Sequence, residues 1–268
     1  LVGLLIGDGT YLESPGIISC DEEIKDYIRS KYKTSIYGKS YTTVDNKLCE
    51  TLGIKGIRNE LRELGIHGQS GNNKRLPDAI FRASREDVAN LIAGLIDTDG
   101  NINIYRSNKG NRLPSTTVSI ATSNIELAKQ IQLLLIKLGV YANILIKKPS
   151  KSIKRIMDKN PYYSIEISSR DSIIALHDSV NLLVGYKQDR LDEAYNININ
   201  KKRWRKNKFE YETIKSIKHV GRKVVYNLSA GNTHTYLGNG IITHNSNFYG
   251  ILQMLYNPRG YNIYALPN

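Results

Sequence analysis

The stretch Leu1-Val-Gly-Leu-Leu-Ile-Gly-Asp8-Gly9 returns in varied form as Ile92-Ala-Gly-Leu-Ile-Asp97-Thr-Asp99-Gly100. Each copy is an apolar run that ends in Asp-Gly and carries small residues four positions apart, namely Gly3 and Gly7, then Gly94 and Thr98. Small residues at this spacing allow two helix backbones to approach closely, so we expect two helices that pack on each other. We also expect the glycine after each aspartate to end its helix in the left-handed conformation.

Similar elements follow each copy and predict a repeated fold. After the first copy we expect strands at 10–13 and 16–19, a helix at 21–32, further strand-like sequence and a helix at 57–64. After the second copy we expect strands at 101–105 and 116–121, a helix at 124–138, further strand-like sequence and a helix at 172–183. The predicted fold class is α+β, with two α-β-β-α-β-β-α halves, residues 1–90 and 91–198, related by a pseudo-two-fold axis.

The charge of the chain indicates the class of partner. Its 268 residues include 38 Lys and Arg against 25 Asp and Glu, which gives a net charge of +13. A field of this sign attracts polyanions, of which nucleic acid is the commonest. The alternative is a basic soluble protein without such a partner.

The two cysteines, Cys20 and Cys49, do not stand at a metal-ligand spacing. So few thiols in a chain of this length favour a reducing compartment over a disulfide scaffold. We therefore expect two structural thiols in a cytoplasmic protein. No apolar run approaches the ~20 residues that span a bilayer, so we expect no membrane segment.

The aspartate near the end of each copy is unusual for a helix. A carboxylate at a helix C-terminus faces the negative end of the helix dipole, and close packing of the two helices would also bring Asp8 near Asp99. A divalent cation reverses the sign of both penalties, and Mg²⁺ prefers carboxylate oxygens. Metal-bound carboxylates can support phosphodiester hydrolysis. The alternative is that Asp-Gly simply ends a core helix in each copy.

These nonapeptides resemble the LAGLIDADG motifs of homing endonucleases, and the two-copy form resembles monomeric members encoded within inteins. The resemblance covers about residues 1–195 and implies Mg²⁺-dependent cleavage of double-stranded DNA, with Asp8 and Asp99 as metal-binding, catalytic acids. Ile6 departs from the motif, where an aspartate is usual. The family also implies a lysine near each site. Lys74, in Asn73-Lys74-Arg75-Leu76-Pro77, and Lys187 are the candidates, although a coincidental lysine is easy to find in so basic a chain.

Members of the family place two curved sheets on duplex DNA, so polar residues that alternate along the strands are candidates for base contacts. These candidates are Asn101, Asn103, Tyr105, Arg106, Ser115, Thr117 and Ser119. The alternative is that they form a solvated strand face. A basic run is better suited to phosphates and comprises Lys147, Lys148, Lys151, Lys154 and Arg155. A further basic run within 201–208 is a candidate contact or a solvated linker.

From about Phe209 the pattern changes to strand-like sequence at 213–219 and 223–228. Residues 225–237 and 239–246, the latter ending His244-Asn245-Ser246, resemble the two C-terminal motifs of inteins, which have the Hint splicing fold. The resemblance implies cyclisation of Asn245, assistance from His234 and His244, and Ser246 as the nucleophile after the junction. Asn227 departs from the acidic residue found in many inteins.

We expect the splicing segment to occupy residues 199–245 and a remnant of a host protein to occupy 246–268. Because the chain begins within a motif, we expect a piece of a longer protein that needs an N-terminal intein segment for complete splicing. Ser246 would complete a P-loop after an upstream Gly-Lys, which predicts a P-loop ATPase host. Two alternatives are a splicing element whose nuclease only binds DNA, and a chain whose main role is that of the ATPase.

Overall fold

The structure, a computed structural model, describes residues 1–42, 46–106, 114–148 and 162–201, and short stretches at 213–214, 216–219, 221–222, 224, 235–238 and 241–244. The chain divides into two compact units, Leu1–Lys208 and Phe209–Asn268. Within the described residues, no helix has the length and apolar character needed to cross a membrane.

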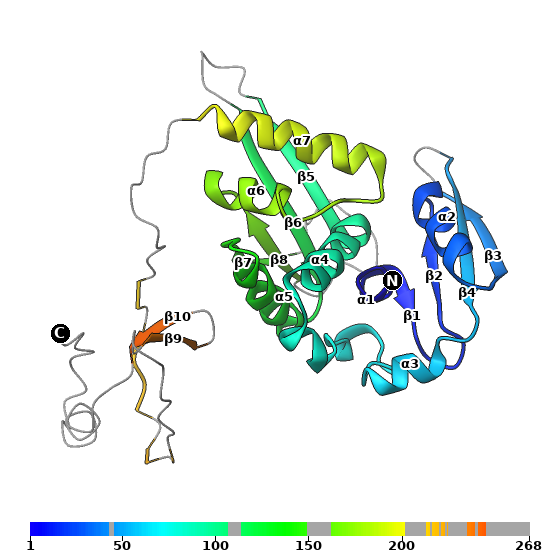
Figure 1. The fold of residues 1–268 in the computed structure, drawn as a ribbon, viewed down its shortest axis with the longest axis horizontal. Coiled ribbons are helices and arrows are strands. Elements are labelled where there is room, and N and C mark those ends of the chain that lie inside the picture. The colour runs from blue at the N-terminus through cyan, green and yellow to red at the C-terminus, as the bar shows by residue number, and fades with distance from the viewer. Residues whose placement is uncertain are drawn as a thin grey trace. The chain divides into compact units, whose positions relative to one another are not determined.

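The first half of unit Leu1–Lys208 has the predicted order of elements (Figure 1). They are α1 (Val2–Asp8), β1 (Gly9–Thr10), β2 (Gly16–Ser19), α2 (Glu22–Lys31), β3 (Thr34–Tyr41), β4 (Leu48–Ile54) and α3 (Arg58–Glu63). The strands form an antiparallel sheet in the order β1-β2-β4-β3. Two 3-10 turns, Gly71–Asn73 and Asp78–Arg82, lead to the second half.

The second half repeats the order and adds a helix. Its elements are α4 (Arg85–Asp99), β5 (Gly100–Tyr105), β6 (Ser115–Thr122), α5 (Ile125–Lys137), β7 (Asn143–Lys147), β8 (Tyr162–Ile167), α6 (Arg170–His177) and α7 (Gly185–Ile199). The sheet order β5-β6-β8-β7 matches that of the first half. The helix predicted at 172–183 is wrong at its end, because α6 stops at His177. Val180 and Val184 are buried beyond it, so the apolar pattern continued past the helix.

Helices α1 and α4 pack against each other at the centre of the unit (Figure 1). A Cβ atom on Gly3 would overlap the carbonyl oxygen of Leu91, and one on Gly94 would lie 2.8 Å from the backbone nitrogen of Leu4. Since both obstacles are backbone atoms, the helices can come this close only where these positions lack side chains. The prediction of close packing through small residues is confirmed.

The glycines after the aspartates do not adopt the expected left-handed conformation. Gly9 has φ −88° and Gly100 has φ −86°, both extended, because the chain passes directly from each helix into β1 or β5. A side chain there would overlap Leu5 or Ile96 one turn back in the helix. The glycines are needed for space and not for a positive φ.

The hydrophobic cores of the two halves interlock. Ile6, from the first half, belongs to the core that surrounds α4 and α5. Val184, from the second half, belongs to the core of Leu4, Leu5 and Ile17. Each half therefore depends on a side chain from the other.

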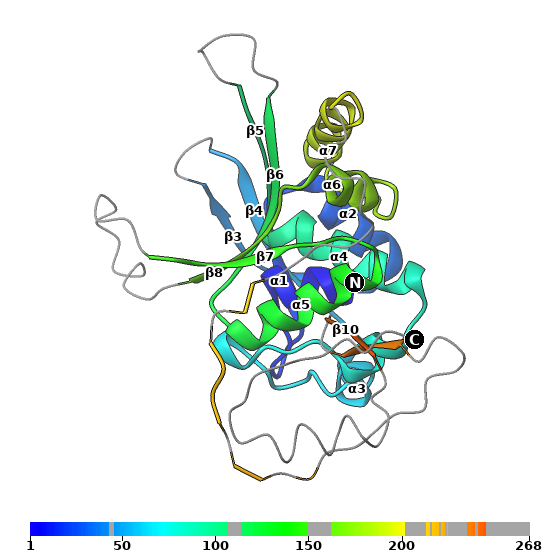
Figure 2. The same ribbon diagram turned by 90° about the vertical axis from the view of Figure 1, so that its left-hand side faces the viewer.

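In Figure 2 the β3–β4 and β7–β8 hairpins extend from one side of the unit, away from α1 and α4.

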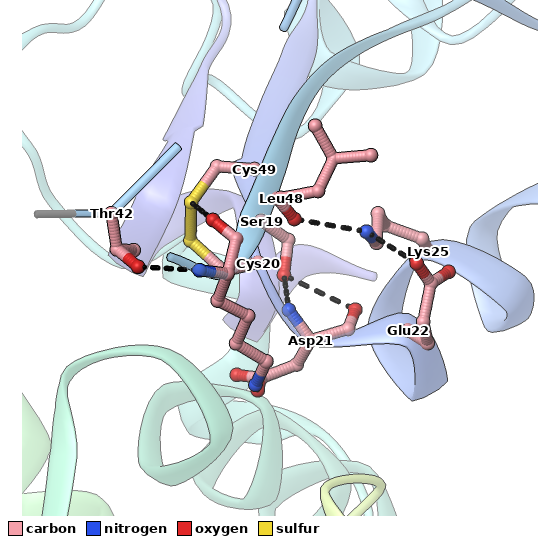
Figure 3. Close-up of a disulfide and its surroundings, with 9 residues drawn as sticks. Ser19, Cys20, Asp21, Glu22, Lys25, Thr42, Leu48 and Cys49 are labelled. Carbon is pink, nitrogen blue, oxygen red and sulfur yellow. Dashed lines mark hydrogen bonds and ion pairs between the residues drawn. A yellow bond between two sulfur atoms is a disulfide. The ribbon is translucent and has the colours of Figure 1, made fainter. Parts of the chain in front are cut away.

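The expectation of two free thiols is wrong, because a disulfide joins Cys20 and Cys49 (Figure 3). Cys20 directly follows β2 and Cys49 lies in β4. The adjacent cross-strand pair, Ser19 opposite Glu50, brings the two cysteines face to face. This pairing depends on the register of two strands, which cysteine spacing alone does not reveal.

The Cys49→Ser substitution is expected to lower the free energy of unfolding by roughly 3 kcal/mol, because the disulfide closes a loop between residues 29 apart and restricts the unfolded chain. Urea unfolding with and without a thiol reductant measures the effect. Reductant should shift the midpoint of the wild type and leave that of the variant unchanged. A wild-type midpoint that ignores complete reduction would contradict the prediction.

Unit Phe209–Asn268 contains an antiparallel hairpin of β9 (Thr235–Gly238) and β10 (Ile241–His244), with His244 opposite Thr235. The strand predicted at 213–219 is not formed at the described residues 213–214 and 216–219. Ile214 and Ile217 are exposed, so the apolar pattern there does not mark a packed strand among the described residues. Most of the strand expected at 223–228 lies outside the described residues.

Candidate active site

The paired helices α1 and α4 bring Asp8 and Asp99 to the same end of the helix pair. A Cβ atom built on Gly7 would lie 3.2 Å from Oδ2 of Asp99, so the Asp99 carboxylate reaches across to the last turn of α1. Both aspartates keep part of their surface open to solvent, while the surrounding protein displaces water from their carboxylates. The predicted juxtaposition of two carboxylates is therefore present in the fold.

The carboxylates hold their protons more tightly than isolated aspartates do. Loss of surrounding water, followed by repulsion from Asp8, raises the pKa of Asp99 to about 6. Loss of water also raises the pKa of Asp8, and the ammonium groups of Lys187 and Lys74 oppose that rise. The repulsion is what two acids create when they share one site without a cation.

The two candidate lysines lie at the C-terminal ends of these helices. The Nζ atom of Lys74 donates hydrogen bonds to the carbonyl oxygens of Ile6, Gly7 and Gly9 at 2.8, 2.8 and 3.2 Å. Burial lowers the pKa of Lys74, while the carboxylates of Asp99 and Asp8 raise it. A cation here is favoured by the negative end of the helix dipole.

Lys187, a residue of α7, lies at the C-terminal end of α4 as Lys74 does at that of α1. Its Nζ atom donates to the carbonyl oxygens of Ile96, Asp97 and Thr98 at 2.8, 2.7 and 3.3 Å. Burial lowers its pKa, and nearby carboxylates, with Asp97 first, raise it. The structure thus gives Lys74 and Lys187 matching positions, although one comes from a loop and the other from α7.

A pocket of about 480 Å³ opens beside Asp99 and Lys74. Its lining includes the loop residues Gln69 and Ser70 and, from strands β6 and β8 of the second half, Thr122 and Tyr162. The Tyr11 ring is buried beneath Lys74, with its centroid 5.5 Å from Nζ. Sequence reasoning missed these residues, because they come from separate elements and share no local motif.

The carboxylates suit a hard cation that brings other ligands with it. Within the described residues, no group of three or more His, Cys, Asp or Glu side chains is arranged to hold a metal ion. A cation between Asp8 and Asp99 would therefore complete its shell with water or substrate oxygens. Mg²⁺ commonly binds in this way, through one or two carboxylates plus waters and phosphates.

The predicted polar face of the second sheet is present. Asn101 pairs with Ser119, Asn103 with Thr117 and Tyr105 with Ser115 across β5 and β6. Residues directly opposite on antiparallel strands share a face, so all six point away from the core formed by Ile102 and Val118. This geometry fits both a DNA-contacting face and a solvated one.

The basic residues predicted to contact DNA differ in their surroundings. Arg106 forms an ion pair with Glu193 of α7, and Lys147 forms one with Glu166 at 2.8 Å. Lys148 is exposed. Lys151, Lys154 and Arg155 lie outside the described residues, as does most of the 201–208 run.

The splicing candidates lie almost entirely outside the described residues. His234, Asn245 and Ser246 are not described, and neither is Asn227. His244 is placed only through the backbone pairing of β10 with β9. Their proposed chemistry stays a prediction.

Comparison with known families identifies one segment. Residues 86–181 match the family described as LAGLIDADG-like domain. The replicative DNA helicase DnaB of Rhodothermus marinus is 26% identical over 210 residues, which is 73% of this chain and 21% of the helicase. The DNA polymerase of Thermococcus sp. (strain GE8) is 24% identical over 270 residues, which is 92% of this chain and 14% of the polymerase. The chain thus spans about a fifth or less of these relatives.

Solved structures of homing endonucleases are also similar to this chain. I-WcaI bound to its DNA recognition sequence has a TM-score of 0.45 and 15% identity, covering 70% of this chain and 83% of its own. I-DmoI in complex with DNA and Ca has a TM-score of 0.41 and 17% identity, covering 72% of this chain and 94% of its own. The segment that matches the LAGLIDADG-like family, 86–181, contains the second nonapeptide and Asp99.

Proposed function

We propose that residues 1–208 are a site-specific DNA endonuclease that makes Mg²⁺-dependent double-strand breaks. The observation that carries this proposal is the meeting of Asp8 and Asp99 at the ends of α1 and α4, with a lysine at the end of each helix. The negative end of a helix dipole disfavours a carboxylate. Aspartates with only a structural role would therefore not be expected at the C-termini of two symmetry-related helices.

The proposed roles follow from the geometry. Asp8 and Asp99 would hold the cation through their carboxylate oxygens. The chemistry that bound Mg²⁺ supplies is activation of water and stabilisation of the leaving oxygen. The sheet face that includes Asn101, Asn103 and Thr117 lies along the major groove, and the net charge of +13 strengthens binding to phosphates. The I-WcaI and I-DmoI structures, which contain DNA, motivate this choice of substrate.

The test is cleavage of a duplex that carries the uninterrupted host-gene junction, in Mg²⁺ and in EDTA. Metal-dependent cutting of both strands near the junction is the expected result. Tight binding without cutting would replace the proposal with its alternative, a nuclease-derived domain that only binds DNA.

The effect of Mg²⁺ on stability is expected to depend on pH. Because the pKa of Asp99 is raised to about 6, the folded metal-free protein binds more protons than the unfolded chain between about pH 4 and 6. Its stability should therefore fall as pH rises through this window, and Mg²⁺ should restore it above pH 6 but not well below it. Melting temperatures with and without Mg²⁺ on either side of pH 6 measure this. Equal stabilisation at both pH values would contradict it.

We also propose that the chain from about Phe209 to Asn245 is the C-terminal segment of an intein, with Ser246 as the first residue after the junction. The curated relatives have unrelated names, including a helicase, a ribonucleotide reductase subunit, a DNA polymerase and RecA, and each is matched over 14% to 21% of its length. An element inserted into different hosts would produce this pattern. His234, His244, Asn245 and Ser246 keep their predicted splicing roles, and a P-loop ATPase stays the predicted host. Supplying an N-terminal intein segment and finding no ligated product or cleavage after Asn245 would overturn this.

A further inference from the structure

The C-terminal end of α4 and the N-terminal end of α7 cap each other. The Asp97 side chain is only 2% exposed, and its carboxylate accepts hydrogen bonds from the backbone N–H groups of Leu183 at 3.0 Å and Val184 at 3.1 Å. Val184 is the N-cap residue of α7. The Asp97 carboxylate therefore lies at the positive end of the α7 dipole, where a negative charge is favoured.

Lys187, in the first turn of α7, in turn donates hydrogen bonds to the C-terminal end of α4. Its three hydrogen bonds go to the last carbonyl oxygens of α4 at Ile96, Asp97 and Thr98. An ammonium group has three N–H donors, so these carbonyls use all of them. Lys187 is 7% exposed, and donating to water or phosphate would require it to give up one of these bonds.

We infer that Asp97 and Lys187 are positioning residues that form a reciprocal clamp between α4 and α7 and thereby hold Asp99 in place. Asp99 follows the clamped turn directly, so its backbone position is set by the same hydrogen bonds. Lys187 then acts through Asp99 and not on the substrate itself. For its catalytic consequence, the inference rests on the proposed endonuclease function.

The end of α1 is bonded by Lys74 but lacks a carboxylate that corresponds to Asp97, which makes the two halves unequal. Ile6 stands where α4 has Asp97, and its side chain is buried in the core with Leu76. Lys74 comes from a loop, is half-buried and lines the pocket beside Asp99. Side-chain amides hold this loop instead: Asn124 donates to the Lys74 carbonyl at 2.8 Å, and Gln130 accepts from the Leu76 N–H at 3.0 Å. Loss of the clamp should therefore disturb one aspartate more than the other.

The first experiment tests the clamp without DNA or metal. A double-mutant cycle in the full chain combines Asp97→Asn with Lys187→Met, which keeps most of the apolar stem of the lysine. Each single variant should lower the midpoint of urea unfolding, and the double variant should fall little further, because both substitutions break one unit. The exposed Asp189, two residues beyond Lys187 on α7, provides the matched control Asp189→Asn, which should leave the midpoint unchanged. Additive effects of Asp97→Asn and Lys187→Met would overturn the clamp.

The second experiment resolves the two DNA strands. With each strand labelled separately, Asp97→Asn should slow cleavage of one strand by roughly tenfold to a hundredfold more than the other, because small misplacements of a catalytic group are costly. Nicked duplex should accumulate while the dissociation constant for DNA stays unchanged. A general loss of stability would slow both strands equally, and that result would overturn a positioning role.

The outcomes separate this inference from the proposed function. If the wild type cuts neither strand, the endonuclease proposal fails, whereas the unfolding cycle still decides whether the clamp exists. If Lys187→Met stops cutting while Asp97→Asn leaves both strand rates at wild-type values, Lys187 acts on the substrate and the inference is wrong.

Discussion

Asp99→Asn is expected to reduce Mg²⁺-dependent cutting of the junction duplex by roughly a thousandfold or more, and Asp8→Asn is expected to do the same. Asparagine keeps the size of the side chain but removes the charge that holds a cation. Since the pKa of Asp99 is raised partly by repulsion from Asp8, either substitution should also relieve that repulsion and leave the metal-free protein at least as stable. The variants should thus fold well and bind DNA while failing to cut it.

Single-turnover cleavage, DNA binding and melting temperature measure these three properties. Glu86→Gln is the matched control, because Glu86 is an exposed carboxylate in the first turn of the same helix, far from Asp99. It should cut at the wild-type rate. Normal cutting by Asp8→Asn and Asp99→Asn would remove the carboxylates from the reaction and leave the proposed site without a basis.

Gly94→Ala is expected to lower the free energy of unfolding by about 3 kcal/mol, and Gly94→Val to prevent folding. An added Cβ would lie 2.8 Å from the Leu4 nitrogen and 3.1 Å from two backbone atoms of Gly3. These atoms cannot rotate away, so α1 and α4 would have to separate, and both cores depend on their contact. Urea unfolding of the purified variants measures the effect.

Gly185 provides the contrasting glycine for this experiment. A Cβ atom there would meet only the Glu23 carboxylate, at 3.5 Å, which is an ordinary contact. Gly185→Ala lies in the first turn of α7 and should be neutral or slightly stabilising, because alanine favours helix more than glycine does. Equal effects at Gly94 and Gly185 would mean that close packing of α1 and α4 does not limit stability.

Much of the fold could be predicted because its signals are local. Apolar periodicity and the repeated nonapeptide indicated the order of elements that the two halves share, but they did not indicate α7. The small residues indicated how α1 and α4 meet. The errors occurred where a distant partner decides the outcome. Val180 and Val184 continue the apolar pattern beyond α6, where Val180 stays in the core of the second half and Val184 packs in that of the first. The pattern itself does not reveal that the helix has already ended.

The candidate site divides in the same way. Asp8 and Asp99 could be selected from their position at the ends of two apolar runs. No role could be assigned to Asp97 from the sequence, because its partners at Leu183 and Val184 are 86 and 87 residues away. Likewise, the Cys20–Cys49 disulfide follows from the β2–β4 register. Both relationships depend on tertiary contacts and leave no pattern in the nearby sequence.

The interlocked cores have a consequence for the history of the chain. Two identical copies of a half could be exchanged freely, as subunits of a symmetric dimer are. Here Ile6 completes the core of the second half and Val184 that of the first, and the position that matches Asp97 is apolar. Each copy has thus become a specialised complement of the other, so neither half could be duplicated, swapped or recombined with a foreign half without leaving an interior incompletely filled.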